Sequence, residues 1–326
     1  MVICVAILNH LIEKANTSVS RSEPVVEQTP VQLEQSNSWL ADIDAARGLD
    51  AVIEAIVDTL PQHNQWCVEF GAWDGIWGSN SRNLILKNDY AAVLIEGNQG
   101  KFRALQKNYA GHRQVVTVNQ YVGFDAGDGL DTILARTSIP RDFDFLSIDI
   151  DGNDYHVWNA VVKYQPKVVC IEFNPTIPPE VSFVQPADRS INQGSSLAAL
   201  VELGKKKHYE LIAVIGVNSF FVVQKLYPLF KITNNRIEAL WLNRDKVTYI
   251  FSGYDGRVFL RGCQNLPWHA IPLLESKVQH VPRCLRKHPY PRWGRITYLC
   301  LTDPLSLIPQ MTQRIMRYTQ QWKGQS

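Results

Sequence analysis

Residues 66–85, WCVEFGAWDGIWGSNSRNLI, join an apolar run to helix-forming sequence through a turn that contains glycine. The run holds one carboxylate, Glu69. Gly71 and Gly75 bracket the turn, and Asp74 lies between them. Turns between a strand and a helix bind cofactors in many α/β proteins, because glycine lets the backbone approach a ligand closely. Glycine-rich turns also occur without a ligand, so the neighbouring segments are needed to interpret this one.

Strand-like and helix-like segments alternate after this point. Five runs are apolar enough for strands buried on both faces, at 66–70, 91–98, 115–122, 143–151 and 167–175. Helix-like segments follow them, at 81–88, 101–109, 129–137, 155–164 and 195–207. Before the first run, apolar residues spaced by three and four predict one more helix, which Pro61 ends. Five such units in a row predict a parallel sheet with helices on both faces.

The last apolar segment, 208–224, contains two runs separated only by residues 216–218, which is a hairpin signal. The final strand therefore runs antiparallel to the others. We predict one Rossmann-like α/β domain over residues 47–225. An N-terminal segment and linker at 1–46 precede it, and a small appendage at 226–326 follows it.

The appendage differs from the rest of the chain in charge. It has 15 Lys and Arg against 5 Asp and Glu, a net charge of +10, whereas the remainder carries −8. A basic region of this kind suits an anionic partner or a docking face. Short β-like pieces flank a Tyr-Asp-Gly turn in it, and a last helix is expected at Leu305–Trp322.

The cysteines and the N-terminus indicate the compartment. Six scattered cysteines form no CxxC pair, which disfavours a structural zinc site; they are Cys4, Cys67, Cys170, Cys263, Cys284 and Cys300. The apolar opening at 1–12 lacks a basic n-region and a cleavage site, and it is too short to span a bilayer. We therefore expect a soluble, cytoplasmic protein without a membrane span.

The charges at the first turn favour a cationic ligand. A dinucleotide-binding turn has the pattern G-x-G-x-x-G, with backbone amides facing a pyrophosphate. Here Trp73 stands in place of the middle glycine, and Asp74 would put negative charge where phosphates bind. S-adenosylmethionine has a sulfonium and an ammonium group and no phosphate, so these residues favour it over NAD. Glu96 ends the second run, where an acid can accept hydrogen bonds from both ribose hydroxyls.

These segments resemble the class I S-adenosylmethionine-dependent methyltransferases and, within them, the FkbM-type family. The resemblance is carried by VEFGAWDG, LIEGNQGKFRALQKN, DFLSIDIDGNDYHVW, KVVCIEFNP and SLAALVELGKKKHYELI, in this order between residues 66 and 225. It implies a seven-stranded sheet with a reversed last strand, and methyl transfer to an oxygen of a sugar or another small molecule. The chain departs from the family at Gly97, where proline is usual, and at 151–154, where Glu-Gly-Ala-Glu is usual.

The resemblance also implies a set of cofactor-binding residues at strand ends: Glu69, Gly71, Gly75, Glu96, Asn98, Asn119 and Asp125. The first three would line the methionine half, and Glu96 would bind the ribose with Asn98 beside it. Asn119 and Asp125 would approach the adenine. A structural alternative is that Glu69 caps the next helix and that Glu96 is a solvated loop acid.

Polar side chains are concentrated where the fourth and fifth strands end: Asp149, Asp151, Asp154, His156, Glu172 and Asn174. Three interpretations are open. In the first, Asp151 or His156 is the catalytic general base that removes a hydroxyl proton. In the second, Asp149, Asp151 and Asn174 hold Mg²⁺, which is not expected but suits an oxygen-ligand site. In the third, Asp149 binds the ammonium group of the cofactor and the other residues cap helices.

Residues 175–194 form a connection too long for a plain turn, and we predict a loop that covers the substrate. The sequence therefore predicts a methyltransferase that acts on a small-molecule or sugar hydroxyl. One alternative is a nucleic-acid methyltransferase that uses the basic region 226–326. Against it, no recognisable nucleic-acid-binding module occurs there. Another alternative is a non-catalytic protein that binds the cofactor or a partner.

Overall fold

The computed structural model describes residues 48–283, 286, 288 and 289. Within them, seven strands form one sheet in the order β3-β2-β1-β4-β5-β7-β6. Their bounds are Trp66–Phe70 (β1), Ala91–Ile95 (β2), Val115–Val118 (β3), Phe145–Ile148 (β4), Val168–Glu172 (β5), Tyr209–Ile215 (β6) and Asn218–Val223 (β7). Neighbouring strands are parallel except at β7, which is antiparallel to β5 and β6. The predicted fold, a seven-stranded, mostly parallel sheet with a reversed last strand and helices on both faces, is confirmed.

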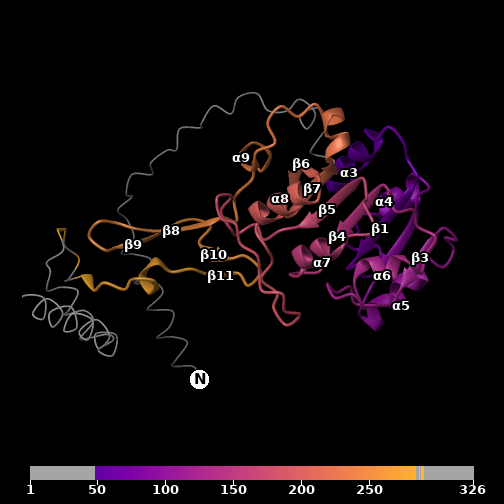
Figure 1. The fold of residues 1–326 in the computed structure, drawn as a ribbon. Helices are drawn as coiled ribbons and strands as arrows, with labels where there is room; N and C mark the ends of the chain where they lie inside the picture. The colour runs from indigo at the N-terminus through magenta and orange to yellow at the C-terminus, as the bar shows by residue number, and fades with distance from the viewer. Residues whose placement is uncertain (1–47, 284–285, 287, 290–326) are drawn as a thin grey trace, which may run out of the picture. The chain divides into compact units, whose positions relative to one another are not determined.

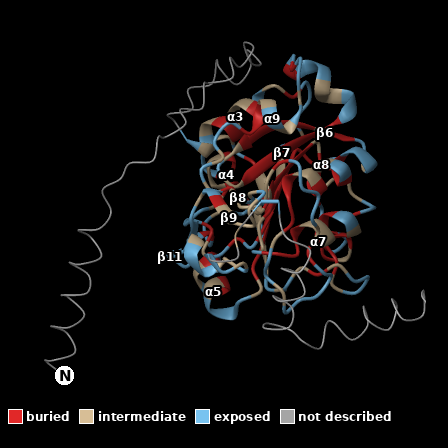
Figure 2. Ribbon diagram, turned by 90° about the vertical axis from the view of Figure 1, so that its left-hand side faces the viewer, coloured by how far each residue is buried: buried red, intermediate tan, exposed pale blue. Residues whose placement is uncertain are grey.

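Helices cover both faces of this sheet (Figure 1). Their bounds are Leu49–Asp58 (α3), Arg82–Lys87 (α4), Gln99–Asn108 (α5), Leu130–Leu134 (α6), Asp154–Ala160 (α7) and Leu197–Lys206 (α8). Apolar residues of α3, α4 and α5 pack on one face, and those of α6, α7 and α8 pack on the other. The strands between them are largely buried, as the red ribbon in Figure 2 shows. The expectation of strands buried on both faces is confirmed for β1, β2, β4 and β5. It is wrong for β3, which lies at the edge of the sheet and has no fully buried residue.

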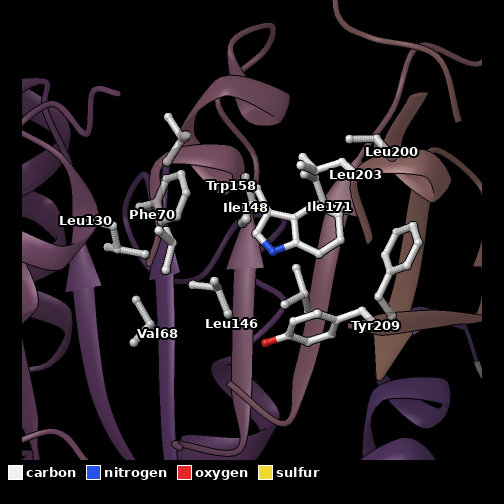
Figure 3. Close-up of a cluster of buried hydrophobic side chains, with 14 of the residues drawn as sticks. Val68, Phe70, Leu130, Leu146, Ile148, Trp158, Ile171, Leu200, Leu203 and Tyr209 are labelled. Atoms are coloured by element: carbon white, nitrogen blue, oxygen red, sulfur yellow. The ribbon is translucent and has the colours of Figure 1, made fainter. Parts of the chain in front are cut away.

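The face beneath α6, α7 and α8 is built around Trp158 (Figure 3). Side chains of β1 alternate between the two faces: Val68 and Phe70 join this cluster, whereas Cys67 joins the one beneath α3–α5. The ring of Trp158 meets Tyr209 of β6 edge-on, with 5.7 Å between ring centroids. Buried aromatic side chains of this size contribute much of the apolar area that stabilises a core.

The core extends beyond residue 225. A 3-10 helix at Gln224–Phe230 (η2) and a short helix at Ile237–Leu240 (α9) follow β7. Phe230, Trp241 and Val247 are buried within the two core clusters. The first twenty or so residues after β7 therefore pack on the α/β domain. The domain boundary placed at residue 225 from the sequence stays a prediction.

Two hairpins and a short helix complete the described chain. Their elements are Thr248–Ser252 (β8), Val258–Gly262 (β9), Asn265–Leu266 (β10), Ile271–Pro272 (β11) and Glu275–Lys277 (η3). Among the described residues, no helix combines the length and the apolar character needed to cross a bilayer. The predictions for segment 1–46, for the helix at Leu305–Trp322 and for Cys4, Cys284 and Cys300 lie outside the described residues.

Candidate functional site

A cavity of about 660 Å³ opens at the carboxyl ends of β1, β2, β3 and β4. Open α/β sheets bind ligands at this edge, and the volume falls in the range of small-molecule sites. The cavity wall includes Gly71 after β1, Glu96 after β2, Tyr121 after β3 and Asp149 after β4. The glycine-containing turn with which the sequence analysis began therefore borders a cavity. We call it the large cavity.

The two predicted glycines have different surroundings. Gly71 lines the large cavity and has a positive φ of 74°. A Cβ at this position would overlap with the carbonyl oxygen of Asp149, so only glycine lets β1 and β4 end this close together. Gly75 instead packs on α5, where a Cβ would overlap with Leu105 and Tyr109. Gly75 is needed for the packing of the turn, and Gly71 also shapes the cavity.

Glu69 holds the turn in front of α4. Its side chain is buried and accepts hydrogen bonds from the hydroxyls of Ser79 and Ser81, both at 2.6 Å, and from the N–H of Asn80 at 2.7 Å. Burial raises the pKa of Glu69, and these hydrogen bonds counteract the shift. Side chains alternate along β1, so Glu69 projects toward the α4 side of the sheet. Its geometry matches the capping alternative, and Glu69 is not among the residues of the cavity wall.

Glu96 is buried and lines the large cavity. One carboxylate oxygen accepts the N–H of Trp73 at 2.9 Å, and the other accepts the N–H of Asn98 at 2.6 Å. Each oxygen has a further lone pair that can accept a hydrogen bond from a ligand. Glu96 is therefore held in a fixed orientation at the cavity wall.

Three other predicted cofactor residues have structural partners. The side chain of Asn98 caps α5 by accepting the N–H groups of Gly100 and Lys101. Asn119 donates to the carbonyl oxygen of Glu96 at 2.7 Å and so ties the end of β3 to the end of β2. Asp125 is exposed and pairs with Arg189. The structure therefore places these three side chains around the large cavity but not in its wall.

Residues 120–124, between Asn119 and Asp125, line the large cavity instead. Tyr121 is largely exposed, and its ring lies against Gly97, where a Cβ would overlap with it. This close contact explains why the chain has glycine at 97. The sequence analysis did not identify Tyr121, although the absent side chain at residue 97 was a signal that something approaches the backbone there.

Three carboxylates meet at the ends of β4 and β5. Asp149, Asp151 and Glu172 have oxygen atoms that all lie within 4.8 Å of one another. Burial, followed by the charge of Asp149, raises the pKa of Glu172 to about 9. Burial also raises the pKa of Asp149. Burial and the closeness of the two carboxyl groups therefore raise the proton affinity of the Asp149–Glu172 pair.

Asp151 differs from its two neighbours in conformation and exposure. It is exposed, and its φ of 58° lies in the left-handed region, which Asp and Asn tolerate better than most residues. It lines the large cavity and also a second one, described below. Of the two predicted catalytic residues, Asp151 is the one that the structure places in a cavity wall.

His156, the other predicted catalytic residue, faces the loop that follows β5. Its Nε2 lies 2.8 Å from the carbonyl oxygen of Gln185 and therefore donates to it. The imidazole lies 5.5 Å from the ring of Phe124 and 5.4 Å from that of Tyr155, between ring centroids. His156 is not among the residues that line either cavity, so its geometry favours a structural role.

Asp154 and Asn174 also accept hydrogen bonds from residues close to them in the sequence. Asp154 is buried and accepts the N–H groups of Ile150 and Gly152, and burial raises its pKa to about 7. Asn174 uses its side-chain oxygen to accept from the N–H and hydroxyl of Thr176. Of the residues predicted to suit Mg²⁺, the structure brings Asp149 and Asp151 together with Glu172. Asn174 lines a cavity with Asp151 and Glu172, but its side-chain oxygen is already engaged by Thr176.

A second cavity of about 210 Å³ adjoins the large one; the two share Asp151 and Asn192 in their walls. We call it the small cavity. Glu172 and Phe173, from the end of β5, and Trp268, from the turn between β10 and β11, also line it. The three carboxylates therefore lie where the two cavities meet.

Residues 175–194 are held over these cavities by Gln185, which is buried. Its amide nitrogen donates to Asn153 at 2.9 Å, and its amide oxygen accepts the N–H groups of Gln193 at 2.9 Å and Gly194 at 2.8 Å. Arg189, four residues later, lines the large cavity. The segment thus forms part of the cavity wall, as a covering loop would, and its action on a substrate stays a prediction.

Arg189 connects this segment to the chain after β3. Its Nη2 lies 2.7 Å from Asp125 and 2.5 Å from Asp128. Its guanidinium also lies 5.6 Å from the centre of the Phe124 ring. We call these contacts the Arg189 latch. Because β3 and β5 lie on opposite sides of β1, the latch joins the two sides of the large cavity.

Replacing Arg189 by glutamine is expected to open the latch. Two half-exposed ion pairs and a cation–π contact together contribute about 1–1.5 kcal/mol. Amide hydrogen exchange in residues 185–194 should therefore become about tenfold faster. The same substitution at Arg236, which forms an exposed pair with Glu238, is the matched control and should leave this exchange unchanged. Equal exchange rates in wild type and Arg189→Gln would show that the latch does not hold the segment.

Solved structures resemble the chain over about half of its length. The N-terminal domain of EvdMO1 with SAH bound is 9% identical, with a TM-score of 0.37, over 54% of this chain and 79% of that one. A SAM-dependent methyltransferase from Aquifex aeolicus is 9% identical, with a TM-score of 0.34, over 57% and 97%. M. jannaschii TYW2 in complex with AdoMet is 12% identical, with a TM-score of 0.31, over 56% and 77%.

Neither a protein-family model nor a curated protein sequence matches the chain. Structural similarities of this size do not indicate what the chain does. Inference about its function therefore has to start from its own cavities and side chains.

Proposed function

We propose that this chain is an S-adenosylmethionine-dependent methyltransferase that acts on a hydroxyl of a small molecule or sugar, as the FkbM-type family it resembles does. The observation that carries the proposal is the position of Glu96. A buried carboxylate with a fixed orientation, at the end of the strand next to the glycine turn, suits two ribose hydroxyls. Gly71 lines the same cavity, so its backbone borders the space beside Glu96.

The charges of the large cavity fit a cofactor that is cationic and lacks phosphate. Asp149 and Glu96 bring carboxyl groups to the wall. The basic side chains of the wall already have partners, since Lys101 lies 3.3 Å above the Trp73 ring and Arg189 forms the latch. A pyrophosphate would meet repulsion here, whereas an ammonium or sulfonium group would be attracted.

Each part of the cofactor has a candidate partner. Glu96 would accept the ribose hydroxyls, Asp149 would accept the ammonium group, and Tyr121 would present a ring to the adenine. When bound, S-adenosylmethionine supplies a methyl group, whose C–S bond breaks as an O–C bond to the acceptor forms, with the electron pair leaving on sulfur. Asp151, between the two cavities, would take the hydroxyl proton. Alignment of the two reactants would provide most of the rate enhancement.

The three carboxylates leave a role for Mg²⁺ open. Carboxylate oxygens suit this ion, and a bound divalent ion would acidify an acceptor hydroxyl. Sensitivity of methyl transfer to EDTA separates this route from a general base alone. The carboxylates where the two cavities meet disfavour a nucleic acid, because they would repel its phosphate groups.

Replacing Glu96 by alanine tests the proposal. Calorimetric titration with S-adenosylhomocysteine should give micromolar binding to wild type. The dissociation constant should rise at least about 100-fold in Glu96→Ala, because two hydrogen bonds to a charged acceptor are lost. Glu202→Ala, which removes an exposed acid on α8, should bind like wild type.

Glu96 also accepts two backbone N–H groups, so the melting temperature of each variant has to be measured as well. Glu96→Gln keeps the side-chain volume and one acceptor oxygen, so it should lose affinity but less than Glu96→Ala, with less loss of stability. A folded wild type that does not bind S-adenosylhomocysteine would refute the proposed cofactor and favour the non-catalytic alternative.

A further inference from the structure

We propose that Trp268 binds the methyl acceptor, and that the small cavity takes an uncharged ring compound with several hydroxyl groups. This inference rests on the proposed function and extends it to the acceptor. Under this proposal, the hairpin that carries Trp268, in the region after residue 225, forms part of the acceptor-binding site.

Trp268 reaches the small cavity from a hairpin that is anchored to the core. Val247 is buried in the core cluster, and its carbonyl oxygen accepts the N–H of Cys263 at 2.8 Å. The hydroxyl of Thr248 donates to the carbonyl oxygen of Cys263 at 2.7 Å. A Cβ at Gly262, whose φ is 77°, would overlap with the carbonyl oxygen of Val247. The chain that leads into β10 therefore lies directly on a buried residue.

Backbone hydrogen bonds close the β10–β11 hairpin on both sides of Trp268. The N–H of Leu273 donates to the carbonyl oxygen of Gln264 at 2.7 Å, and the N–H of His269 donates to that of Leu266 at 3.0 Å. Trp268 occupies this turn and is 61% exposed. A large apolar ring in a tight turn gains little from folding when it remains in water. Its position in the wall of the small cavity indicates a ligand that would cover it.

Other residues that line the small cavity carry hydrogen-bond acceptors. Asp151, Glu172 and Asn192 contribute oxygen atoms, and Phe173 contributes an apolar edge. A compound with one flat or apolar ring face and several hydroxyl groups would match both sides of this cavity. The ring face would lie on Trp268, and the hydroxyl groups would point to the carboxylates.

The charge of the small cavity restricts the acceptor further. Among the described residues that line it, none is basic, while Asp151, Asp154 and Glu172 are acidic. The exposed carboxylate of Asp151 would repel a phosphate or carboxylate on the reacting ring. The end of the acceptor that enters therefore carries no negative charge, which separates it from nucleotides and sugar phosphates.

The test compares Trp268→Ala and Trp268→Phe with wild type. Methyl transfer from radiolabelled S-adenosylmethionine is measured to a fixed panel of methyl glycosides and catechols, and to sugar 6-phosphates. We expect transfer to at least one uncharged member, with a KM about tenfold higher in Trp268→Ala. kcat should stay within about threefold, and Trp268→Phe should recover most of the loss. The dissociation constant of S-adenosylhomocysteine should be the same in all three proteins.

Tyr254→Ala is the matched control, because Tyr254 is an aromatic residue in the other hairpin turn and is 91% exposed. It should leave KM unchanged. The proposal is wrong if Trp268→Ala keeps the wild-type KM, if Tyr254→Ala raises KM equally, or if the sugar phosphates are methylated best. It is also wrong if a wild type that binds S-adenosylhomocysteine methylates no uncharged member. Failure of the proposed function is a separate result, since the wild type would then not bind S-adenosylhomocysteine.

Discussion

Replacing Asp144 by alanine is expected to lower the free energy of unfolding by about 3–5 kcal/mol, because it leaves a buried charge without its partner. Asp144 is fully buried just before β4. It accepts from Lys167 Nζ at 2.6 Å, from the hydroxyl of Tyr90 at 3.1 Å and from the N–H of Gln65 at 3.0 Å. These partners lie just before β5, β2 and β1. Asp144 therefore ties four strands together at the amino edge of the sheet, opposite the cavities.

Urea unfolding of wild type and variant measures this effect. Glu238→Ala, which breaks the exposed pair with Arg236, should change the free energy of unfolding by less than about 0.5 kcal/mol. If Asp144→Ala does not fold, Asp144→Asn and the double variant Asp144→Asn/Lys167→Met serve instead. Removing both charges should lower the free energy of unfolding less than removing one. A loss below about 1 kcal/mol in Asp144→Ala would show that Asp144 does not hold the strands.

Replacing Asp151 by asparagine is expected to lower kcat by about 10²–10⁴, the usual contribution of a general base. Asp151 is the candidate base that lines both cavities. Asparagine has the same shape and also tolerates the positive φ of this position. The backbone should therefore keep its conformation while the proton acceptor is lost. Affinity for S-adenosylhomocysteine should change by less than about threefold, since Glu96 and Asp149 remain.

The rate is measured with the acceptor that the panel identifies, with and without EDTA. Asp245→Asn, at an exposed aspartate after α9, is the control and should keep the wild-type kcat. A kcat in Asp151→Asn within about threefold of wild type would favour the structural interpretation of this strand end. Loss of wild-type activity in EDTA would favour the Mg²⁺ interpretation.

The sheet was predictable from the sequence because its signals are local. Apolar runs such as 143–151 reveal strands buried on both faces, and the short spacing at 216–218 reveals the reversed strand. Gly71 and Glu96 were predictable too, because the carboxyl ends of adjacent parallel strands must meet at one edge. Their place in the cavity wall agrees with this geometry.

The partners of individual side chains were not predictable in the same way. Glu69 meets Ser79 and Ser81 because alternation along β1 directs it to the α4 side, behind the cavity. Asn98 accepts N–H groups at the start of α5, and Asn119 donates to the carbonyl oxygen of Glu96 after β2, so both satisfy backbone groups. A polar residue at a strand end can bind a ligand or satisfy the backbone, and the sequence does not distinguish these uses.

By itself, the sequence determined the order of elements, the reversed strand, the glycine that β4 approaches and the acid at the end of β2. Only the tertiary structure decided that Glu172 joins Asp149 and Asp151, and that Trp268 lines the small cavity beside them. The physical reason is the distance along the chain over which each signal acts. Periodicity and burial act over a few residues, whereas the small cavity joins residues about a hundred positions apart in the sequence. The path of the loops that connect them depends on tertiary packing, which no local sequence pattern records.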